Sequence, residues 1–297
     1  MWFPLSLLAL LMLTARRSAE KKATSNINSM ALTWLQQAMA MPFIIATLFF
    51  AKFYWPTELP AHFWILIAVY VVLSSFDLYI YFKALTIADI SYVAPLLSLV
   101  AVGNVAGAYI VLGQTPSFYG LVGVALIMGG AYLNSIAKNR EKTNVKGNRL
   151  VLWLILAHVI LFGYYANLEV SLLRLSNPTS YNFYTSILSI PLIIFVSSII
   201  IRQRKGHYEN YWVNLKVGVK RHVWPLILIG VTYTINLLAT YQAKLESPNA
   251  AYVGAIKSAS VLPIVLIGLF FFKEKVVRLQ WTGLILIIAG LALIATN

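Results

Sequence analysis

One carboxylate stands well inside a long apolar stretch of this sequence. Asp77 interrupts residues 62–84, about 15 residues from the start of that stretch and so past the middle of a span of about 20. A charge at that depth in a bilayer needs a partner or water. Asp77 is therefore a candidate for proton or cation coupling, or for binding a substrate amine. The alternatives are a helix–helix partner and a place near the interface.

A lysine presents the opposite chemistry. Lys257 lies near the start of residues 251–272, about six residues or roughly 9 Å into a helix. It could bind an anionic substrate group or neutralise a carboxylate, whereas the ordinary alternative is that its long stem reaches the outer interface. Glu169 is near the end of residues 150–172. Since both residues would lie in the outer half of the bilayer, the geometry allows a Glu169–Lys257 pair.

A third charged group lies at the end of the first apolar stretch, where Arg16, Arg17 and Glu20 follow one another within two helical turns. Arg17 and Glu20 are kept as candidate site residues. Anchoring at the membrane interface is the favoured alternative for this cluster.

Polar side chains that hydrogen-bond without a fixed charge recur at mid-depth in four apolar stretches. For any single one, a hydrogen bond between helices is the better explanation. Taken together, they predict a polar lining for a cavity. They are Gln36 and Gln37, Asn104, His158, and Asn236.

Signatures of enzymes are absent from the sequence. It has no cysteine, and it lacks an HExxH helix, a GxSxG elbow and a GxxxxGK[ST] phosphate-binding loop. The four histidines, which include His62, His207 and His222, lack metal-ligand spacing. We therefore expect no catalytic residue, no metal site, no cofactor and no ATP hydrolysis by the chain itself.

The composition identifies the elements that must position these groups. Apolar residues make up 60% of the 297 residues and charged residues 11%, against about 25% charged in soluble domains. Runs of about 20 apolar residues indicate an all-α, polytopic membrane protein. Ten transmembrane helices are expected, near residues 1–20, 30–51, 62–84, 91–113, 117–137, 150–172, 181–201, 223–245, 251–272 and 279–296.

Two segments leave alternatives open. Residues 1–15 are apolar but lack a basic leader and a cleavage site, so a first span is favoured over a cleaved signal peptide. Residues 202–222 form the longest loop, and its WVNLKVGVKRHVW portion is either an amphipathic helix at the interface or a solvated loop.

The positive charge indicates topology rather than nucleic-acid binding. The net charge is +14, but the cations stand in short connectors. Loops after odd-numbered spans hold about 18 of the 23 Lys and Arg, which predicts that these loops are cytoplasmic and both termini outside. An integral, multi-pass protein of a bacterial or archaeal cytoplasmic membrane is expected.

The chain repeats itself. Shifted by 160 residues, residues 81–133 match residues 241–293, with Gly123 on Gly283 and Gly130 on Gly290. A second match, at a shift of 149, puts Pro42 on Pro191. Because five spans is an odd number, the two copies must enter the membrane in opposite senses, which is an inverted repeat typical of secondary transporters. The predicted division is residues 1–137, a basic connector at 138–149, and residues 150–297.

The repeated stretches resemble the EamA family of the drug/metabolite transporter superfamily. The residues that carry the resemblance are LTIADISYVAPLLSLVAVGNVAGAYIVLGQTPSFYGLVGVALIMGGAYL and PNAAYVGAIKSASVLPIVLIGLFFFKEKVVRLQWTGLILIIAGLALI. The connector has Gln114 where the family often has Glu, and the charge distribution puts the termini outside where many members are drawn inside. The resemblance implies two five-helix repeats and a transport function, but no substrate.

These observations predict a secondary transporter, acting as exporter or exchanger of a small polar metabolite, amino acid or drug-like molecule by alternating access. Its partners would be that substrate, the lipid bilayer and a coupled proton or ion, without nucleic acid. A monomer suffices to build the site and a homodimer is compatible. A flippase for a lipid-linked intermediate and a non-transporting scaffold are the alternatives.

Overall fold

The computed structural model describes residues 1–23, 27, 29–87, 93, 96–139, 149–203, 208–271 and 277–296. Throughout these ranges the regular structure is helical, without a strand. The helices are α1 (Trp2–Ala23), α2 (Ser29–Thr47), α3 (Ala61–Ile87), η1 (Leu97–Leu99), α5 (Val100–Leu112), α6 (Phe118–Asn139), α7 (Arg149–Leu175), α8 (Pro178–Gln203), α9 (Tyr208–Arg221), α10 (Val223–Glu246), α11 (Ala250–Ser258), α12 (Val261–Phe271) and α13 (Arg278–Ala295).

Six helices in the described part are long and apolar enough to cross a membrane, namely α3, α6, α7, α8, α10 and α13. Residues 97–112 and 250–266 form shorter apolar helices. Both α1 and α2 fall outside the six. The charges Arg16, Arg17 and Glu20 lower the hydropathy of α1, and Gln36 with Gln37 does the same for α2. The protein is thus a multi-pass, all-helical membrane protein.

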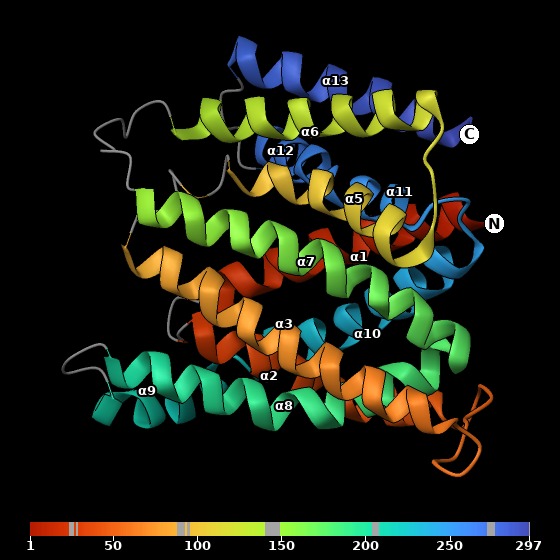
Figure 1. The fold of residues 1–297 in the computed structure, drawn as a ribbon. Helices are drawn as coiled ribbons and strands as arrows, with labels where there is room; N and C mark the ends of the chain where they lie inside the picture. Colours follow the sequence, from red (N-terminus) through yellow and green to blue (C-terminus); the bar gives the residue numbers. More distant parts are fainter. Residues whose placement is uncertain are drawn as a thin grey trace.

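The helices lie side by side along one common direction (Figure 1). The α6–α13 pair forms one edge of the bundle, and α2 with α8 lies towards the other, with α1, α3, α7 and α10 between them. The two chain termini lie at the same end (Figure 1). Segments far apart in the chain are therefore neighbours, and the middle of the bundle is built from both halves.

The main contacts between the halves come in matched pairs. Helix α1 packs on α10, and α7 packs on α3. In the same way α2 packs on α10 and α8 on α3, while α11 packs on α1 and α5 on α7. The α6–α13 and α2–α8 contacts pair helices at corresponding places in the two halves.

Glycines set the closest approach of α6 and α13. A Cβ at Gly290 would lie 2.6 Å from the carbonyl oxygen of Gly123, and one at Gly283 would lie 2.7 Å from that of Gly130. The positions rise along α6 as they fall along α13, so the two helices are antiparallel. Inside a bilayer the hydrophobic effect does not drive helices together. Close backbone contact of this kind therefore supplies the van der Waals energy that holds α6 against α13.

Residues 208–221, for which the sequence left a loop or an amphipathic helix open, form helix α9. Tyr211 and Leu215 are buried against the end of the bundle, whereas Val213 is 61% and Val217 58% exposed. The indole N–H of Trp34 on α2 donates to the Tyr211 hydroxyl at 3.3 Å. Burial raises the pKa of that hydroxyl, so it stays protonated.

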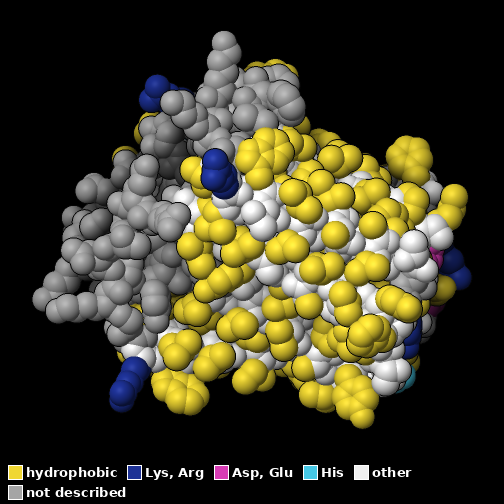
Figure 2. Space-filling view, turned by 90° about the horizontal axis from the view of Figure 1, so that it is seen from above, with side chains coloured by type: hydrophobic (Ala, Val, Ile, Leu, Met, Phe, Trp, Pro, Cys, Tyr) yellow, Lys and Arg dark blue, Asp and Glu magenta, His cyan; other side chains and the backbone are white. Residues whose placement is uncertain are grey.

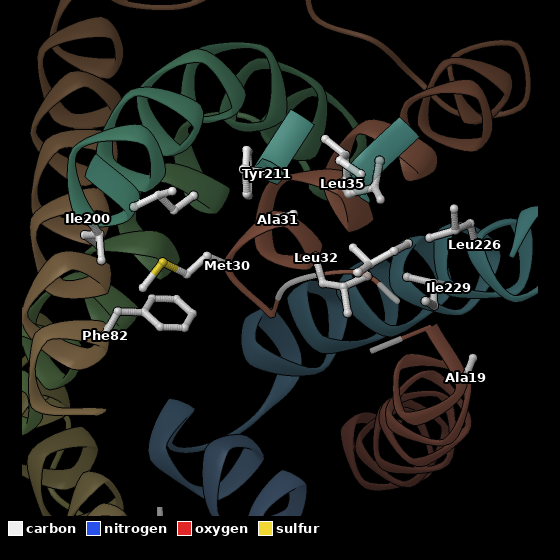
Figure 3. Close-up of a cluster of buried hydrophobic side chains, with 13 residues drawn as sticks. Ala19, Met30, Ala31, Leu32, Leu35, Phe82, Ile200, Tyr211, Leu226 and Ile229 are labelled. Atoms are coloured by element: carbon white, nitrogen blue, oxygen red, sulfur yellow. The ribbon is translucent and has the colours of Figure 1, made fainter. Parts of the chain in front are cut away.

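An apolar cluster closes this end of the bundle. Figure 3 shows Met30 of α2 beside Phe82 of α3 and Ile200 of α8, with Leu226 and Ile229 of α10 on the other flank. Because six helices contribute to it, the cluster fixes the ends of the helices that carry the polar groups described below.

The outer surface is suited to lipid. Figure 2 looks onto the edge formed by α6 and α13, where hydrophobic side chains cover the face and the Lys and Arg side chains lie at its margins. Exposed apolar residues on this edge include Leu121, Tyr132, Ile285 and Ile288. A face of this kind is stable in hydrocarbon and costly in water.

Candidate functional site

Helix α7 presents polar groups along a single stripe. His158, Phe162, Tyr165 and Glu169 follow one another at spacings of four, three and four residues, so they share one face of a helix. The neighbouring stripe carries Gly163, where an added Cβ would strike the backbone of Gly103 on α5. Tight packing on one stripe thus orients the polar stripe toward the middle of the bundle.

The first polar group joins α3 to α7. His158 Nδ1 lies 2.7 Å from Asp77 Oδ1, and the Tyr165 hydroxyl donates to Asp77 Oδ2 at 3.0 Å. Asp77 is 2% exposed. The rings of Tyr81 and Phe162 lie 5.4 and 5.9 Å from the His158 ring. A carboxylate and an imidazole at this distance can share, take up and release one proton.

The second polar group joins α7 to α10. Lys244 Nζ donates to Glu169 Oε1 at 2.7 Å and to the Ala166 carbonyl at 2.8 Å. The Tyr70 hydroxyl of α3 donates to Glu169 Oε2 at 3.3 Å. Both carboxylate oxygens and the ammonium are therefore engaged, as a buried ion pair requires.

Tyrosine rings connect the two groups. Tyr70, which binds Glu169, meets Tyr165, which binds Asp77, edge-on at 5.6 Å between ring centres. Tyr181 of α8 lies 5.8 Å from Tyr70 and 5.1 Å from Tyr241 of α10. Asp77, His158 and Glu169, recognised from the sequence, are thus parts of one network that spans α3, α7 and α10.

The suggested Glu169–Lys257 pair is wrong, because the cation that binds Glu169 is Lys244. Depth along the chain suited both lysines, but the α7–α10 contact brings Lys244 to Glu169. Lys257 lies in the last turn of α11, close enough to Glu169, Lys244, Arg16 and Arg17 to interact electrostatically.

Among the charges of α1, Arg16 and Glu20 are partly buried, whereas Arg17 is exposed. Arg16 Nε pairs with Glu20 Oε1 at 3.1 Å, and the Arg16 guanidinium lies 5.2 Å from the centre of the Tyr233 ring. Arg17 donates to the Ser260 hydroxyl at 2.9 Å. Arg17 and Glu20 therefore bind protein groups, and Arg17 contacts the same interrupted helix that carries Lys257.

That interruption divides the ninth predicted span. Helix α11 ends at Ser258 and α12 begins at Val261, with Ala259 and Ser260 between them. At the matching place in the first half, the short 3₁₀ helix η1 precedes α5. Broken helices at membrane depth expose backbone groups and are common where transporters bind substrates and ions.

Two of the neutral candidates join helices. Asn236 donates to the Ala9 carbonyl at 2.6 Å, which ties α10 to α1. The Ser189 hydroxyl donates to Gln37 Oε1 at 2.8 Å, which ties α8 to α2.

Asn104 differs from these two. Its carbonyl accepts from Asn167 at 3.1 Å, while its side-chain Nδ2 lies 2.7 Å from where a Cβ of Gly254 would be. Gly254 is one turn from Lys257, so the Asn104 amide lies beside the lysine's helix.

Sequence reasoning missed Lys244, Tyr70 and Tyr165. The four-three-four spacing from His158 to Glu169 on α7 was a usable signal for Tyr165. Gln114 also has a local role that was not foreseen, since its Oε1 accepts the backbone N–H of Ala250 at 2.9 Å at the start of α11. Tyr252 is buried and accepts the N–H of Ser117 at 2.9 Å.

One cavity in the described part of the structure lies elsewhere. It has a volume of ≈ 650 Å³ and is lined mainly by apolar side chains between α5 and α6, such as Val102, Leu121 and Met128. None of the candidate site residues lines it. Among the described residues, no group of three His, Asp or Glu could hold a metal ion.

Comparison with known proteins covers the whole bundle. A solved crystal structure of a protein resembles this chain with a TM-score of 0.65 at 14% identity, over 99% of this chain and 97% of the other, which shows the shared fold. An uncharacterized transporter of Methanothermobacter thermautotrophicus is 24% identical over 144 residues, or 48% of this chain. The match spans 42% of that relative's own length. Residues 1–136 and 149–296 match the EamA-like transporter family, so this chain is a membrane transporter that belongs to that family.

Proposed function

We propose that the protein is a ten-span secondary transporter, built from two inverted five-helix repeats at residues 1–137 and 150–297, that moves a small polar metabolite by alternating access. In this arrangement α1 corresponds to α7, α2 to α8, α3 to α10 and α6 to α13. The segment formed by η1 and α5 corresponds to the segment formed by α11 and α12. Helix α9 is an insertion in the second repeat. The substrate, an amino acid or drug-like molecule included, would bind between the repeats near the midplane.

The matched contacts support this assignment. Exchanging each helix for its counterpart turns the α1–α10 contact into α7–α3, and the α5–α7 contact into α11–α1. The glycine pairs obey the same exchange, because the 160-residue shift converts the Gly123–Gly290 contact into Gly283–Gly130. A two-fold axis in the membrane plane accounts for both observations.

One observation carries the transport proposal, namely the network from Asp77 through Tyr165 and Tyr70 to Glu169 and Lys244. It joins α3 of the first repeat to α7 and α10 of the second. Ionisable groups in a membrane bundle are costly and mark substrate or ion pathways. Rocking of one repeat against the other would strain the network most, so its protonation can bias which side is open.

Coupling to a proton is part of the proposal. Asp77 with His158 is the preferred coupling site because two titratable groups face each other at 2.7 Å. Glu169, which pairs with Lys244 at 2.7 Å, is the second candidate. Export and exchange remain the proposed modes, with the basic odd-numbered loops on the cytoplasmic side of a bacterial or archaeal membrane.

The flippase alternative requires a lateral opening lined with Lys and Arg. Among the described residues, those lining the cavity between α5 and α6 are mainly apolar and include neither Lys nor Arg. A scaffold would gain nothing from three intramembrane carboxylates.

Uptake into proteoliposomes tests the function. The purified chain is reconstituted with an imposed pH gradient and offered labelled amino acids, amines and organic anions. Uptake above empty liposomes that collapses with the gradient supports coupled transport. Absence of uptake and exchange across the whole panel contradicts it.

A further inference from the structure

The charges of the polar groups described above do not balance. Among the described residues these groups contain three acids and four cations, and three of the cations have named partners. The acids are Glu20, Asp77 and Glu169, and the cations are Arg16, Arg17, Lys244 and Lys257. Lys83 of α3 is not counted with them, since it has an interaction of its own. His158 pairs with Asp77. The three acids and four cations together therefore carry an excess of positive charge.

The excess is localised at Lys257. Arg16 binds Glu20, Lys244 binds Glu169, and Arg17 binds the Ser260 hydroxyl. No described residue forms a hydrogen bond or an ion pair with Lys257. Its nearest charges are mostly cations.

Lys257 lies seven residues beyond the first residue of α11, about 10 Å along the helix axis, which exceeds the reach of its four-carbon stem. The side chain is partly exposed, with Val253, Ala255 and Ile256 buried beside it and Ser258 exposed. The carbonyl end of α11 offers it a partial negative charge, but a partial charge does not offset a full one.

We propose that the transported substrate carries an anionic oxygen group, a carboxylate or a phosphate, which Lys257 binds. This inference rests on the transport function proposed above and names its substrate class. Lys257 supplies the charge at the carbonyl end of α11. Arg17 reaches the same interruption through Ser260 at 2.9 Å and has guanidinium donors to spare. Asn104, beside Gly254, supplies an uncharged donor one turn away.

The chemistry disfavours the other substrate classes. A cationic amine would meet Lys257, Arg17 and Lys244 together, and like charges in a medium of low dielectric repel strongly. An anion instead supplies the missing counter-charge, and leaves the pairs of Glu169 and Glu20 intact.

The test is counterflow in proteoliposomes with three matched panels: mono- and dicarboxylates with phosphate esters, amines, and neutral polyols. The wild-type chain is expected to exchange at least one member of the first panel and none of the second. The variant Lys257→Met should raise the KM for that anion at least tenfold. The variant Lys257→Arg keeps the positive charge, so its KM should stay close to the wild-type value. Lys52→Met, which removes a cation from the loop after α2, is the matched control and should leave the KM unchanged.

Each outcome decides the proposal. Exchange of amines or polyols alone would keep the transport function and overturn the anion assignment, as would an unchanged KM in Lys257→Met. Exchange of nothing in the three panels would contradict both. If Lys257→Met fails to reconstitute, thermal unfolding in detergent replaces it: the anion should raise the Tm of wild type and of Lys257→Arg but not of Lys257→Gln, and equal shifts would overturn the assignment.

Discussion

At the scale of residues, the interior is organised by pairs that consume almost every charge. His158 and Tyr165 satisfy both oxygens of Asp77, and Lys244 and Tyr70 satisfy both oxygens of Glu169. Removing one member of such a pair leaves its partner buried and uncompensated, which costs more than replacing both.

Replacement of Lys244 tests that asymmetry. Lys244→Met should destabilise the protein by about 3 kcal/mol because it leaves Glu169 charged and buried. Lys244→Met combined with Glu169→Gln should recover most of the loss. The measurement is a double-mutant cycle on thermal unfolding in detergent, and additive effects of the two changes would contradict the pairing.

Replacement of Asp77 tests the coupling site. Asp77→Asn keeps the size of the side chain and removes its proton site, so uptake should lose its dependence on the pH gradient while exchange without a gradient persists. Glu169→Gln is the comparison variant. If Asp77→Asn retains full gradient dependence and Glu169→Gln loses it, the coupling site is Glu169.

At the scale of elements, backbone contact between helices determines which side chains meet. The α6–α13 contact depends on glycines at positions where any Cβ would strike a carbonyl of the other helix. The α5–α7 contact also depends on glycines. This contact orients the polar stripe of α7 toward the middle of the bundle.

Two glycine-to-leucine variants of α6 test whether its close approach to α13 stabilises the protein. Gly130→Leu should destabilise the protein by about 2 kcal/mol or more, because the α13 backbone must move away. Gly129→Leu is the matched control, since nothing lies within 4 Å of its Cβ position, and it should be nearly neutral. Equal melting temperatures for the two variants would show that the close approach does not matter.

Sequence reasoning recovered the helices better than it recovered their neighbours. The apolar runs predict where α3, α7 and α10 lie, and mid-depth Asp77, Glu169 and His158 stood out because charge in hydrocarbon is costly. The partner of Glu169 could not be chosen, since Lys244 and Lys257 have similar depth and only the rotation and packing of α10 and α11 distinguish them. The tyrosine bridge was hidden for the same reason, because tyrosines are ordinary in membrane helices.

At the scale of the whole molecule, the proposed alternating access needs two halves that cross the membrane in opposite senses. The proposed exchange of the halves would account for the glycine contacts and the helix pairs together. Under this proposal the substrate site lies between the halves, and Lys257, where the first half has Leu97, gives the two sides of the site different charges.

Labelling of two equivalent positions tests this claim most directly. The chain has no cysteine, so single cysteines can be introduced at Phe118, the start of α6, and at Arg278, the start of α13, which the 160-residue shift superimposes. In oriented vesicles a membrane-impermeant maleimide should reach Phe118→Cys and Arg278→Cys from opposite sides of the membrane. Labelling of both from the same side would contradict the inverted repeat and, with it, the proposed site between the halves.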